Sequence, residues 1–290
     1  MSMTFFGCFC MFTEKTQNKN EILRYTIEEK GGRSMKIAIV TGASSGLGKE
    51  FVKQMDGRKQ LDEIWVIARR RECLEAVAKV TKTKVRVVPM DLTRRESFVE
   101  LKALLDQEKP DVALLINAAG MGKIGAWKDI SLSDCEAMID LNCKAAVAVT
   151  QIVLPFMKKG AHIMEICSTA SFQPFPYLSI YAASKAFLYR YSRALRVELY
   201  GTGISVTAVC PYWIKDTEFI GTARKTQNSS YIRHFPLSSK EKHVVSLALM
   251  DADLRLPVST PGPVCLIHRI AAKIIPSELM MGIWALLRRI

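Results

Sequence analysis

Short apolar runs alternate with helical patterns along most of this chain. The apolar runs that predict buried strands cover residues 37–40, 64–68, 85–88, 112–116, 161–167 and 204–209. Between them, apolar side chains recur every three or four residues, which predicts helices that begin near residue 51 and cover 74–80, 98–105, 134–157 and 179–200. Strands that alternate with helices are typical of a doubly wound parallel sheet with helices on both faces. We therefore expect one α/β domain whose ligand lies outside the carboxyl ends of the strands.

The two ends of the chain depart from this alternation. Residues 1–34 combine a short apolar stretch with a polar one, and we expect a disordered tail or a mis-annotated extension, with Met35 as the true initiator. The domain is expected over residues 35–261. Residues 262–290 hold two apolar segments that predict a helical extension, each too short to span a membrane. Packing against the domain is its expected role, and a dimer surface, a lid or a peripheral membrane contact are the alternatives.

Composition narrows the function classes. The chain has 290 residues, 49% of them hydrophobic, so it can bury a full core. Its formal net charge of +13 is spread over many segments, so nucleic-acid binding is not expected. The eight cysteines contain no Cys-x-x-Cys pair and share no metal-ligand spacing with the four histidines. We expect a cytoplasmic protein with reduced cysteines and no metal site.

A glycine-rich loop follows the first predicted strand. Gly42, Gly46 and Gly48 lie between that strand and the next helix, where glycine allows positive φ and close approach of a ligand. The helix N-terminus offers unpaired amides to an anion, so the loop suits a diphosphate. The spacing also matches Gly-x-Ser-x-Gly, the nucleophile elbow of serine hydrolases, with Ser44 as the nucleophile. A glycine-rich turn without a ligand is the third interpretation.

The end of the second strand bears on the choice of ligand. Dinucleotide-binding folds usually carry an acidic residue there, which binds the ribose 2′-hydroxyl. This chain has Ala68 at that place, followed by three arginines. Because a guanidinium can bind a 2′-phosphate with two hydrogen bonds, we expect NADP(H) in preference to NAD(H), with Arg69 on the phosphate.

Two later strand ends lie at the same edge of the predicted sheet. Asp91 and Leu92 follow the third strand, where the carboxylate of Asp91 could meet an adenine amino group or cap the next helix. Asn117 and Gly120 end the fourth strand, either at the ligand or in a plain turn.

Polar residues on the later elements supply candidate chemistry. Asn142 lies on the apolar stripe of a long helix, so its amide either bonds neighbouring backbone or takes part in catalysis. Ser168 closes the fifth strand. Tyr181 and Lys185 are expected one turn apart on the same face of the following helix. A nearby ammonium stabilises a phenolate, which brings a tyrosine of ordinary pKa, about 10, closer to use as an acid and base.

The chain resembles the short-chain dehydrogenase/reductase family over about residues 36–217. Five motifs carry the resemblance, in this order: Thr41-Gly42-x-x-x-Gly46-x-Gly48, Asn117-x-Ala119-Gly120, Asn142, Ser168 and Tyr181-x-x-x-Lys185. The resemblance implies a Rossmann-type fold, a nicotinamide cofactor and the reversible conversion of a carbonyl to an alcohol. It also implies a homodimer or homotetramer.

The resemblance assigns roles to the matched positions. Tyr181 exchanges a proton with the substrate oxygen, Lys185 lowers the pKa of Tyr181 and holds the nicotinamide ribose, and Ser168 hydrogen-bonds the substrate oxygen. Asn142 anchors a water molecule of the proton relay. The expected cofactor contacts are Gly42, Ser44, Ser45, Gly46, Leu47, Gly48, Arg69, Asp91, Leu92, Asn117, Gly120, Tyr181, Lys185, Pro211 and Thr217.

The sequence departs from the family pattern after the sixth strand. Pro211 is followed by Tyr212 where the family usually has glycine, and Thr217 lies one residue late for the usual contact with the nicotinamide carboxamide. The substrate loop, residues 212–239, is rich in aromatic residues. It predicts an apolar lid over a hydroxysteroid-like or other hydrophobic carbonyl substrate. Packing of these aromatic side chains onto the core is the alternative.

Two other functions are compatible with single motifs. A serine hydrolase built on Ser44 needs a histidine downstream, and only His268 comes late enough in the chain. A non-catalytic NADP(H)-binding sensor is expected to lack Tyr181 or Lys185, and this chain has both.

Overall fold

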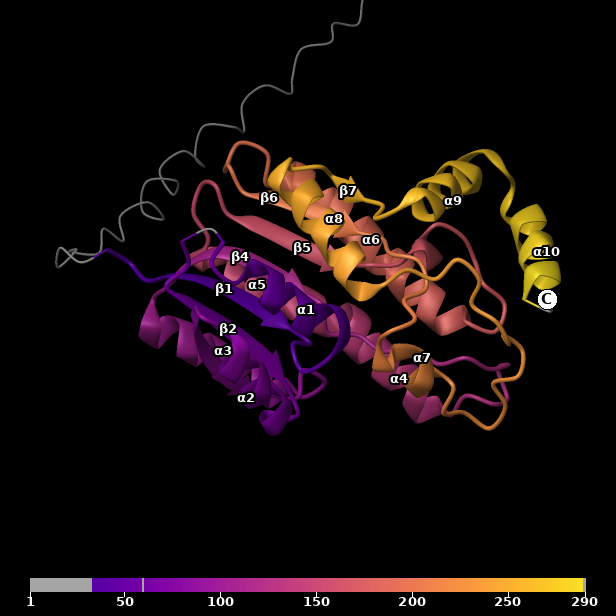
Figure 1. The fold of residues 1–290 in the computed structure, drawn as a ribbon, viewed down its shortest axis with the longest axis horizontal. Helices are drawn as coiled ribbons and strands as arrows, with labels where there is room; N and C mark the ends of the chain where they lie inside the picture. The colour runs from indigo at the N-terminus through magenta and orange to yellow at the C-terminus, as the bar shows by residue number, and fades with distance from the viewer. Residues whose placement is uncertain (1–32, 59, 289–290) are drawn as a thin grey trace, which may run out of the picture. The chain divides into compact units, whose positions relative to one another are not determined.

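The computed structural model describes residues 33–58 and 60–288, and Figure 1 shows their fold. The prediction for the N-terminal extension lies outside the described residues, except at its last two positions. From Met35 onward the described chain is one compact unit.

Parallel strands form one sheet, and in the described residues it has seven strands in the order β3-β2-β1-β4-β5-β6-β7. The strands are β1 Lys36–Thr41, β2 Glu63–Ala68, β3 Lys84–Pro89, β4 Asp111–Asn117, β5 His162–Ile166, β6 Ser205–Val209 and β7 Val258–Ser259. The strand order reverses between β1 and β4, so the crevice outside their carboxyl ends is the topological switch point. The predicted single-domain, Rossmann-type α/β fold is confirmed.

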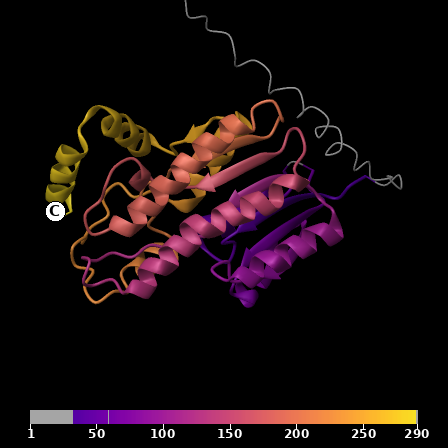
Figure 2. The same cartoon turned by 180° about the vertical axis from the view of Figure 1, so that it is seen from behind.

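Alternate side chains of the strands enter two separate cores. In β1, Ile37 and Ile39 belong to one core and Ala38 and Val40 to the other, as the two-residue period of a strand requires. The first core is covered by α3 (Arg95–Glu108), α5 (Ala145–Val153) and α6 (Ser179–Glu198). The second is covered by α1 (Gly46–Met55), α2 (Arg71–Val80) and α8 (Glu241–Asp253). Figure 2 shows the long helices of the first layer from behind.

One long helical stretch covers the first face of the sheet. It consists of α4 (Leu132–Ile139), a π-helical turn (Asp140–Lys144), α5 and a 3₁₀ turn (Leu154–Phe156). By length and composition it is the one described helix that could cross a membrane, but its residues Val149 and Val153 are fully buried in the first core. The sequence predicted this helix without the π-helical turn, and such turns are frequent at functional sites.

Three elements after β6 have no counterpart in the sequence prediction: α7 (Glu218–Ala223), α8 and β7. Ala248 and Ala252 supply part of the buried face of α8, and such small side chains give a weak apolar stripe. β7 pairs with the end of β6. Because it is only two residues long, it is too short to show the alternation of apolar and polar residues that predicts a strand.

The C-terminal extension forms two helices, α9 (Pro263–Ile274) and α10 (Ser277–Leu287) (Figure 1). Met280 and Trp284 of α10 are buried, and the Trp284 Nε1–H donates to the Pro176 carbonyl at 3.3 Å. The extension therefore packs on the domain through part of its surface. Its exposed apolar side chains are Leu266, Ile267, Ile270, Ile274, Leu279, Ile283, Leu286 and Leu287.

Candidate active site

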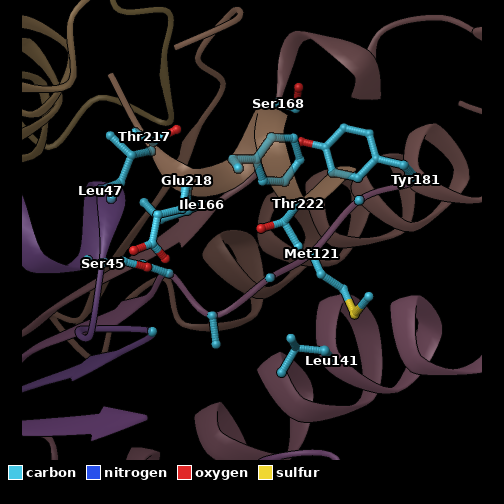
Figure 3. Close-up of a pocket in the computed structure, with 18 of the residues that line it drawn as sticks. Ser45, Leu47, Met121, Leu141, Ile166, Ser168, Tyr181, Thr217, Glu218 and Thr222 are labelled. Carbon is cyan, nitrogen blue, oxygen red and sulfur yellow. The ribbon is translucent and has the colours of Figure 1, made fainter. Parts of the chain in front are cut away.

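A cavity of about 550 Å³ lies at the topological switch point, and Figure 3 shows part of its wall. The glycine loop, the ends of β2 to β5 and the start of α7 border it. The predicted site residues that line it are Gly42, Ser44, Ser45, Gly46, Leu47, Gly48, Arg69, Asp91, Leu92, Gly120, Ser168, Tyr181, Lys185, Pro211 and Thr217. Asn117 and Asn142 are not part of this lining.

The side chain of Asn117 does not reach this cavity, which corrects the predicted cofactor contact. It is 3% exposed, and its Nδ2 donates to Thr150 Oγ1 at 2.8 Å and to Glu165 Oε1 at 2.9 Å. Side chains alternate along a strand, so Asn117 lies on the same face of β4 as Leu115, which belongs to the first core. The amide therefore ties β4 to β5 and α5.

The glycine loop is a closely packed cradle. Gly42 has a φ of 68°, and a Cβ added to it would lie 2.7 Å from the Ala118 carbonyl oxygen. A larger residue would therefore be forced against the backbone after β4. The loop brings Ser44, Ser45 and the N-terminus of α1 to the cavity. These residues fit the diphosphate of a nicotinamide dinucleotide.

Ser44 has no histidine among its described partners. The Arg70 guanidinium donates to Ser44 Oγ at 3.4 Å, whereas His268 lies 3.0 Å from Gln173 Oε1 and packs against Phe172. The arrangement of a nucleophile beside its base is therefore not formed by these two residues.

The loop after β2 brings two arginines to the cavity. Arg69, which was predicted to bind the phosphate, lines the cavity with an exposed side chain. Arg70 also lines it and reaches the glycine loop at Ser44, and its Nη2 lies 2.9 Å from Glu218 Oε2. The sequence prediction missed Arg70 because it ranked the arginines by their distance along the chain from Ala68. The contact with Ser44 depends on the direction of the Arg70 side chain, which no local sequence pattern predicts.

Asp91 lines the cavity and orders the turn before α3. Its Oδ1 accepts hydrogen bonds from the Thr93 N–H at 3.1 Å and the Thr93 hydroxyl at 2.8 Å. Burial raises the pKa of Asp91, but these hydrogen bonds and the charges of Arg69 and Arg94 outweigh it and hold the pKa below the ordinary value. The carboxylate is not the cap of α3, whose N-cap residue is Arg94.

Asn142 is fully buried in the π-helical turn and joins two parts of the site. Its Oδ1 accepts from the Met121 N–H at 2.9 Å, and its Nδ2 donates to the Met121 carbonyl at 2.8 Å and to Ser184 Oγ at 2.9 Å. A Cβ added to Gly120 would lie 3.0 Å from Asn142 Oδ1. The amide thus holds the loop after β4 against the first turns of α6, which is the structural role that the sequence left open. Its part in a proton relay stays a prediction.

Tyr181 and Ser168 meet at the wall of the cavity. The two hydroxyl groups are hydrogen-bonded to one another, and Figure 3 shows both side chains there. Ser168 Oγ also accepts from the Ala170 N–H at 3.1 Å, which fixes the serine at the end of β5. Burial raises the pKa of Tyr181 to about 12, and the bond to Ser168 acts in the opposite direction. The phenol is therefore protonated in this arrangement.

Lys185 lies one helical turn after Tyr181, as predicted. Its Nζ donates to the Ile166 carbonyl at 2.7 Å and lies 5.9 Å from the centre of the Tyr181 ring. The side chain is 5% exposed, and burial lowers the pKa of Lys185. The sequence led us to expect that this ammonium lowers the pKa of Tyr181. The pKa is raised instead, because burial is the largest effect on it.

A buried carboxyl group lies on β5, and the sequence prediction missed it. Glu165 is 0% exposed, and its Oε1 accepts from Asn117 Nδ2 and from the Thr150 hydroxyl, each at 2.9 Å. Burial raises the pKa of Glu165 to about 7, although these hydrogen bonds and the charge of Lys185 act in the opposite direction. Its place between the apolar residues Met164 and Ile166 of the strand was the available signal.

Apolar and aromatic side chains form much of the remaining wall, among them Met121, Leu141, Phe175, Leu178, Trp213, Ile214 and Phe219. Trp213 and Phe219 come from the predicted substrate loop and line the cavity as expected for a lid. Two other aromatic residues of that loop pack elsewhere: Tyr231 stacks on Tyr177 at 4.2 Å, and Phe235 packs on Trp213 at 4.5 Å. Some aromatic residues of the loop therefore line the cavity, whereas others pack against neighbouring aromatic side chains, and the role of the loop as a substrate lid stays a prediction.

Residues 33–58 and 60–288 contain no group of three or more histidine, cysteine or acidic side chains that could hold a metal ion.

Comparison with known proteins identifies the family. The short-chain dehydrogenase family model matches residues 36–228, which is more than half of the chain. An uncharacterized oxidoreductase of Staphylococcus epidermidis is 31% identical over 179 residues, which are 61% of this chain and 76% of that protein. An NADP-dependent 3-hydroxy acid dehydrogenase of Salmonella typhi is 34% identical over 189 residues, which are 63% of this chain and 74% of that protein.

Solved structures agree with this result. A short-chain dehydrogenase from Sphingobium yanoikuyae in complex with NADPH has a TM-score of 0.70 and 27% identity, and the match covers 86% of this chain and 94% of that one. A bulky-bulky ketone specific alcohol dehydrogenase from Comamonas testosteroni has a TM-score of 0.65 and 25% identity, with coverage of 88% and 94%. The chain therefore belongs to the short-chain dehydrogenase/reductase family, NAD(P)-dependent oxidoreductases that act on CH–OH groups.

Proposed function

We propose that this protein interconverts an apolar ketone or aldehyde and its alcohol, with NADP(H) as the preferred cofactor. One observation carries the proposal. The hydrogen-bonded pair of Tyr181 and Ser168 lies in a cavity whose neighbouring wall includes the aromatic side chains of Phe175, Trp213 and Phe219. A polar acid–base group within an apolar wall suits a hydrophobic substrate with a single reactive oxygen.

The residues of the chain divide the chemistry among them. Ser168 holds the substrate oxygen by a hydrogen bond and stabilises the charge that develops on it. Tyr181 gives its hydroxyl proton to that oxygen during reduction and takes the proton back during oxidation. The Lys185 ammonium, one turn away, favours the phenolate that forms when Tyr181 has given up its proton. The nicotinamide ring supplies or accepts the hydride when the cofactor is bound.

The preference for NADP(H) rests on charge. Arg69 and Arg70 both line the cavity after β2, where an NAD(H)-binding site usually carries an acidic residue. The similarity to a Salmonella enzyme named as NADP-dependent and to a Sphingobium structure with NADPH supports this choice. NAD(H) is the alternative cofactor.

The choice of a ketone over a hydroxy acid rests on the lining of the cavity. In its described lining, the cationic side chains are Arg69, Arg70 and Lys185. The two arginines lie at the proposed phosphate end, and Lys185 is bonded to the Ile166 carbonyl, so no further lining cation would pair with a substrate carboxylate. The likeness to the ketone-specific enzyme of Comamonas testosteroni supports an apolar carbonyl.

The assembly that we propose is a homodimer or homotetramer in the cytoplasm. Phe187 and Val197 of α6 are 48% and 71% exposed, and we infer that this helix contributes apolar surface to the contact between subunits. Light scattering of the purified full chain measures the assembly, and a monomer at micromolar concentration would contradict this part of the proposal.

The substrate class is tested by a panel of carbonyl compounds. Bulky apolar ketones, small ketones, aldehydes and 3-oxo acids are each offered to the purified protein with NADPH or NADH, and the loss of reduced cofactor is followed by absorbance. The proposal predicts the highest kcat/KM for bulky apolar carbonyls with NADPH. A preference for 3-oxo acids would contradict the assigned substrate class, and equal rates with NADH would contradict the assigned cofactor.

A further inference from the structure

Three consecutive residues at the start of α7 touch different parts of the cavity. A Cβ added to Gly46 in the glycine loop would lie 3.5 Å from Thr217 Cγ2. The next residue, Glu218, pairs with Arg70, and Phe219 packs against Tyr181 with ring centres 5.5 Å apart. This short segment therefore spans from the proposed phosphate end of the site to its catalytic tyrosine.

The carboxylate of Glu218 lies among groups that favour an anion. Arg70 Nη2 is 2.9 Å from Glu218 Oε2 and 3.4 Å from Ser44 Oγ. Ser45 is a second hydrogen-bond partner of Glu218, and Lys49 contributes positive charge; Figure 3 shows the carboxylate beside Ser45. The hydrogen bond from Arg70 is the main reason why the pKa of Glu218 lies below its ordinary value.

The pair can exchange partners at low cost. The side chains of Arg70 and Glu218 are 47% and 63% exposed, and an exposed ion pair contributes little to stability. A phosphate monoester carries a charge of about −1.5 to −2 near neutral pH, compared with −1 for a carboxylate. A guanidinium also binds phosphate by parallel hydrogen bonds. Arg70 would therefore prefer a 2′-phosphate to Glu218.

At the other end of the segment, Phe219 covers the catalytic tyrosine. A Cβ added to Gly122 would lie 2.8 Å from Phe219 Cζ and 2.9 Å from Tyr181 Cδ2, so this glycine leaves the space in which the two rings meet. Tyr181 is 8% exposed. Two adjacent residues thus contact the two ends of the site: Glu218 pairs with Arg70, and Phe219 covers Tyr181. A movement of one of them would affect the other.

We propose that Glu218 is a cofactor-specificity residue that competes with the 2′-phosphate of NADP(H) for Arg70 and links this exchange to the position of Phe219. This inference rests on the proposed preference for NADP(H). When Arg70 exchanges Glu218 for the phosphate, α7 is released from the loop after β2, and Phe219 moves away from Tyr181. With NAD(H), which carries a hydroxyl at that position, Arg70 keeps Glu218 and the tyrosine stays covered.

Nucleotide fragments without nicotinamide test the competition separately from catalysis. The affinity of adenosine 2′,5′-bisphosphate and of 5′-AMP is measured by calorimetry for wild type, Glu218→Gln and Arg70→Ala. Glu218→Gln should bind the bisphosphate about two- to fivefold more tightly, as expected for an exposed pair, with the affinity for 5′-AMP unchanged. In the Arg70→Ala background the same substitution should have no effect. Glu278→Gln in α10 is the matched control, because it removes one negative charge from an exposed position outside the cavity lining.

Hydrogen exchange of residues 217–223 tests the movement. In the wild type, the bisphosphate should raise the exchange rate of these amides, and 5′-AMP should not. Unchanged bisphosphate affinity in Glu218→Gln, an equal change for 5′-AMP, or unchanged exchange would overturn the inference. A wild type that binds both fragments equally would instead contradict the proposed NADP(H) preference, so the two failures are distinguishable.

Discussion

Asn142 in the π-helical turn donates a hydrogen bond from Nδ2 to Ser184 Oγ at 2.9 Å. Ser184 passes the connection on, because its hydroxyl donates to the Tyr181 carbonyl at 2.8 Å. Together with the two bonds between Asn142 and Met121, this joins the loop after β4 to the helical turn that carries the catalytic tyrosine and lysine. The position of the acid–base pair thus depends on a buried amide outside the cavity lining.

Replacement of Asn142 by alanine should therefore destabilise the fold. The change leaves the Met121 N–H and carbonyl and the Ser184 hydroxyl without this partner, and each lost buried bond costs about 0.5–1.5 kcal/mol. We expect a loss of about 2–4 kcal/mol in the free energy of unfolding, measured by urea denaturation. Ser184→Ala keeps both bonds to Met121 but loses the bonds to Asn142 and to the Tyr181 carbonyl, so it should cost about 1–3 kcal/mol, less than Asn142→Ala. Equal losses in the two variants would contradict the assigned order of importance.

Gly48→Ala should disrupt the glycine loop. A Cβ at this position would clash with the Gly42 carbonyl oxygen, which is a backbone atom and has little freedom to move. We expect at least a tenfold loss of NADPH affinity, measured by fluorescence titration, together with a lower unfolding midpoint. Gly282→Ala in α10 is the control. Its added Cβ meets nothing within 4 Å, so cofactor affinity should be unchanged and stability equal or slightly greater.

The fold was predictable from the sequence because its signals are local. Apolar runs such as 37–40 and 64–67 are buried on both faces, and the glycine loop marks the first strand-to-helix turn. The catalytic pair was predictable for the same reason, since Tyr181 and Lys185 are four residues apart on one helix.

Directions of side chains at strand ends and in loops were not predictable in this way. Asn117 ends β4 at the edge of the sheet where the ligand was expected. Because side chains alternate between the two faces of a strand, its amide points toward Thr150. Arg69 and Arg70 are neighbours in sequence, and only the folded loop brings Arg70 to Ser44 and Glu218. These contacts form between segments that are far apart in the chain, so no local sequence pattern predicts them.

The cofactor preference should change when an acidic residue is restored after β2. Ala68→Asp combined with Arg69→Ser introduces a carboxylate that can bind a ribose 2′-hydroxyl and repels a 2′-phosphate. We expect the ratio of kcat/KM for NADPH to that for NADH to fall by at least tenfold in steady-state assays. An unchanged ratio would refute the assignment of the phosphate to this loop.

Glu165 should make stability depend on pH. Its pKa in the folded protein is about 7, above the ordinary value of 4.5, so the folded state keeps a proton that the unfolded state has lost. The contribution of this group is therefore full below about pH 4.5 and is lost as the pH rises toward 7, by about 3 kcal/mol at most. Urea denaturation of wild type and Glu165→Gln between these pH values checks this. The variant should show the flatter dependence, and identical slopes would mean that the carboxyl group titrates normally.

The role of Tyr181 tests the account most directly. Tyr181→Phe removes one hydroxyl from the wall of the cavity and leaves the glycine loop, Arg69 and Arg70 in place. We measure kcat on a carbonyl substrate of the wild type together with the Kd for NADPH. The account predicts a loss of turnover of at least a thousandfold, as the general acid and its hydrogen bond to the substrate disappear together, with a Kd for NADPH within about threefold of the wild type, because the change removes no residue of the proposed phosphate contacts. Turnover within tenfold of the wild type would contradict it.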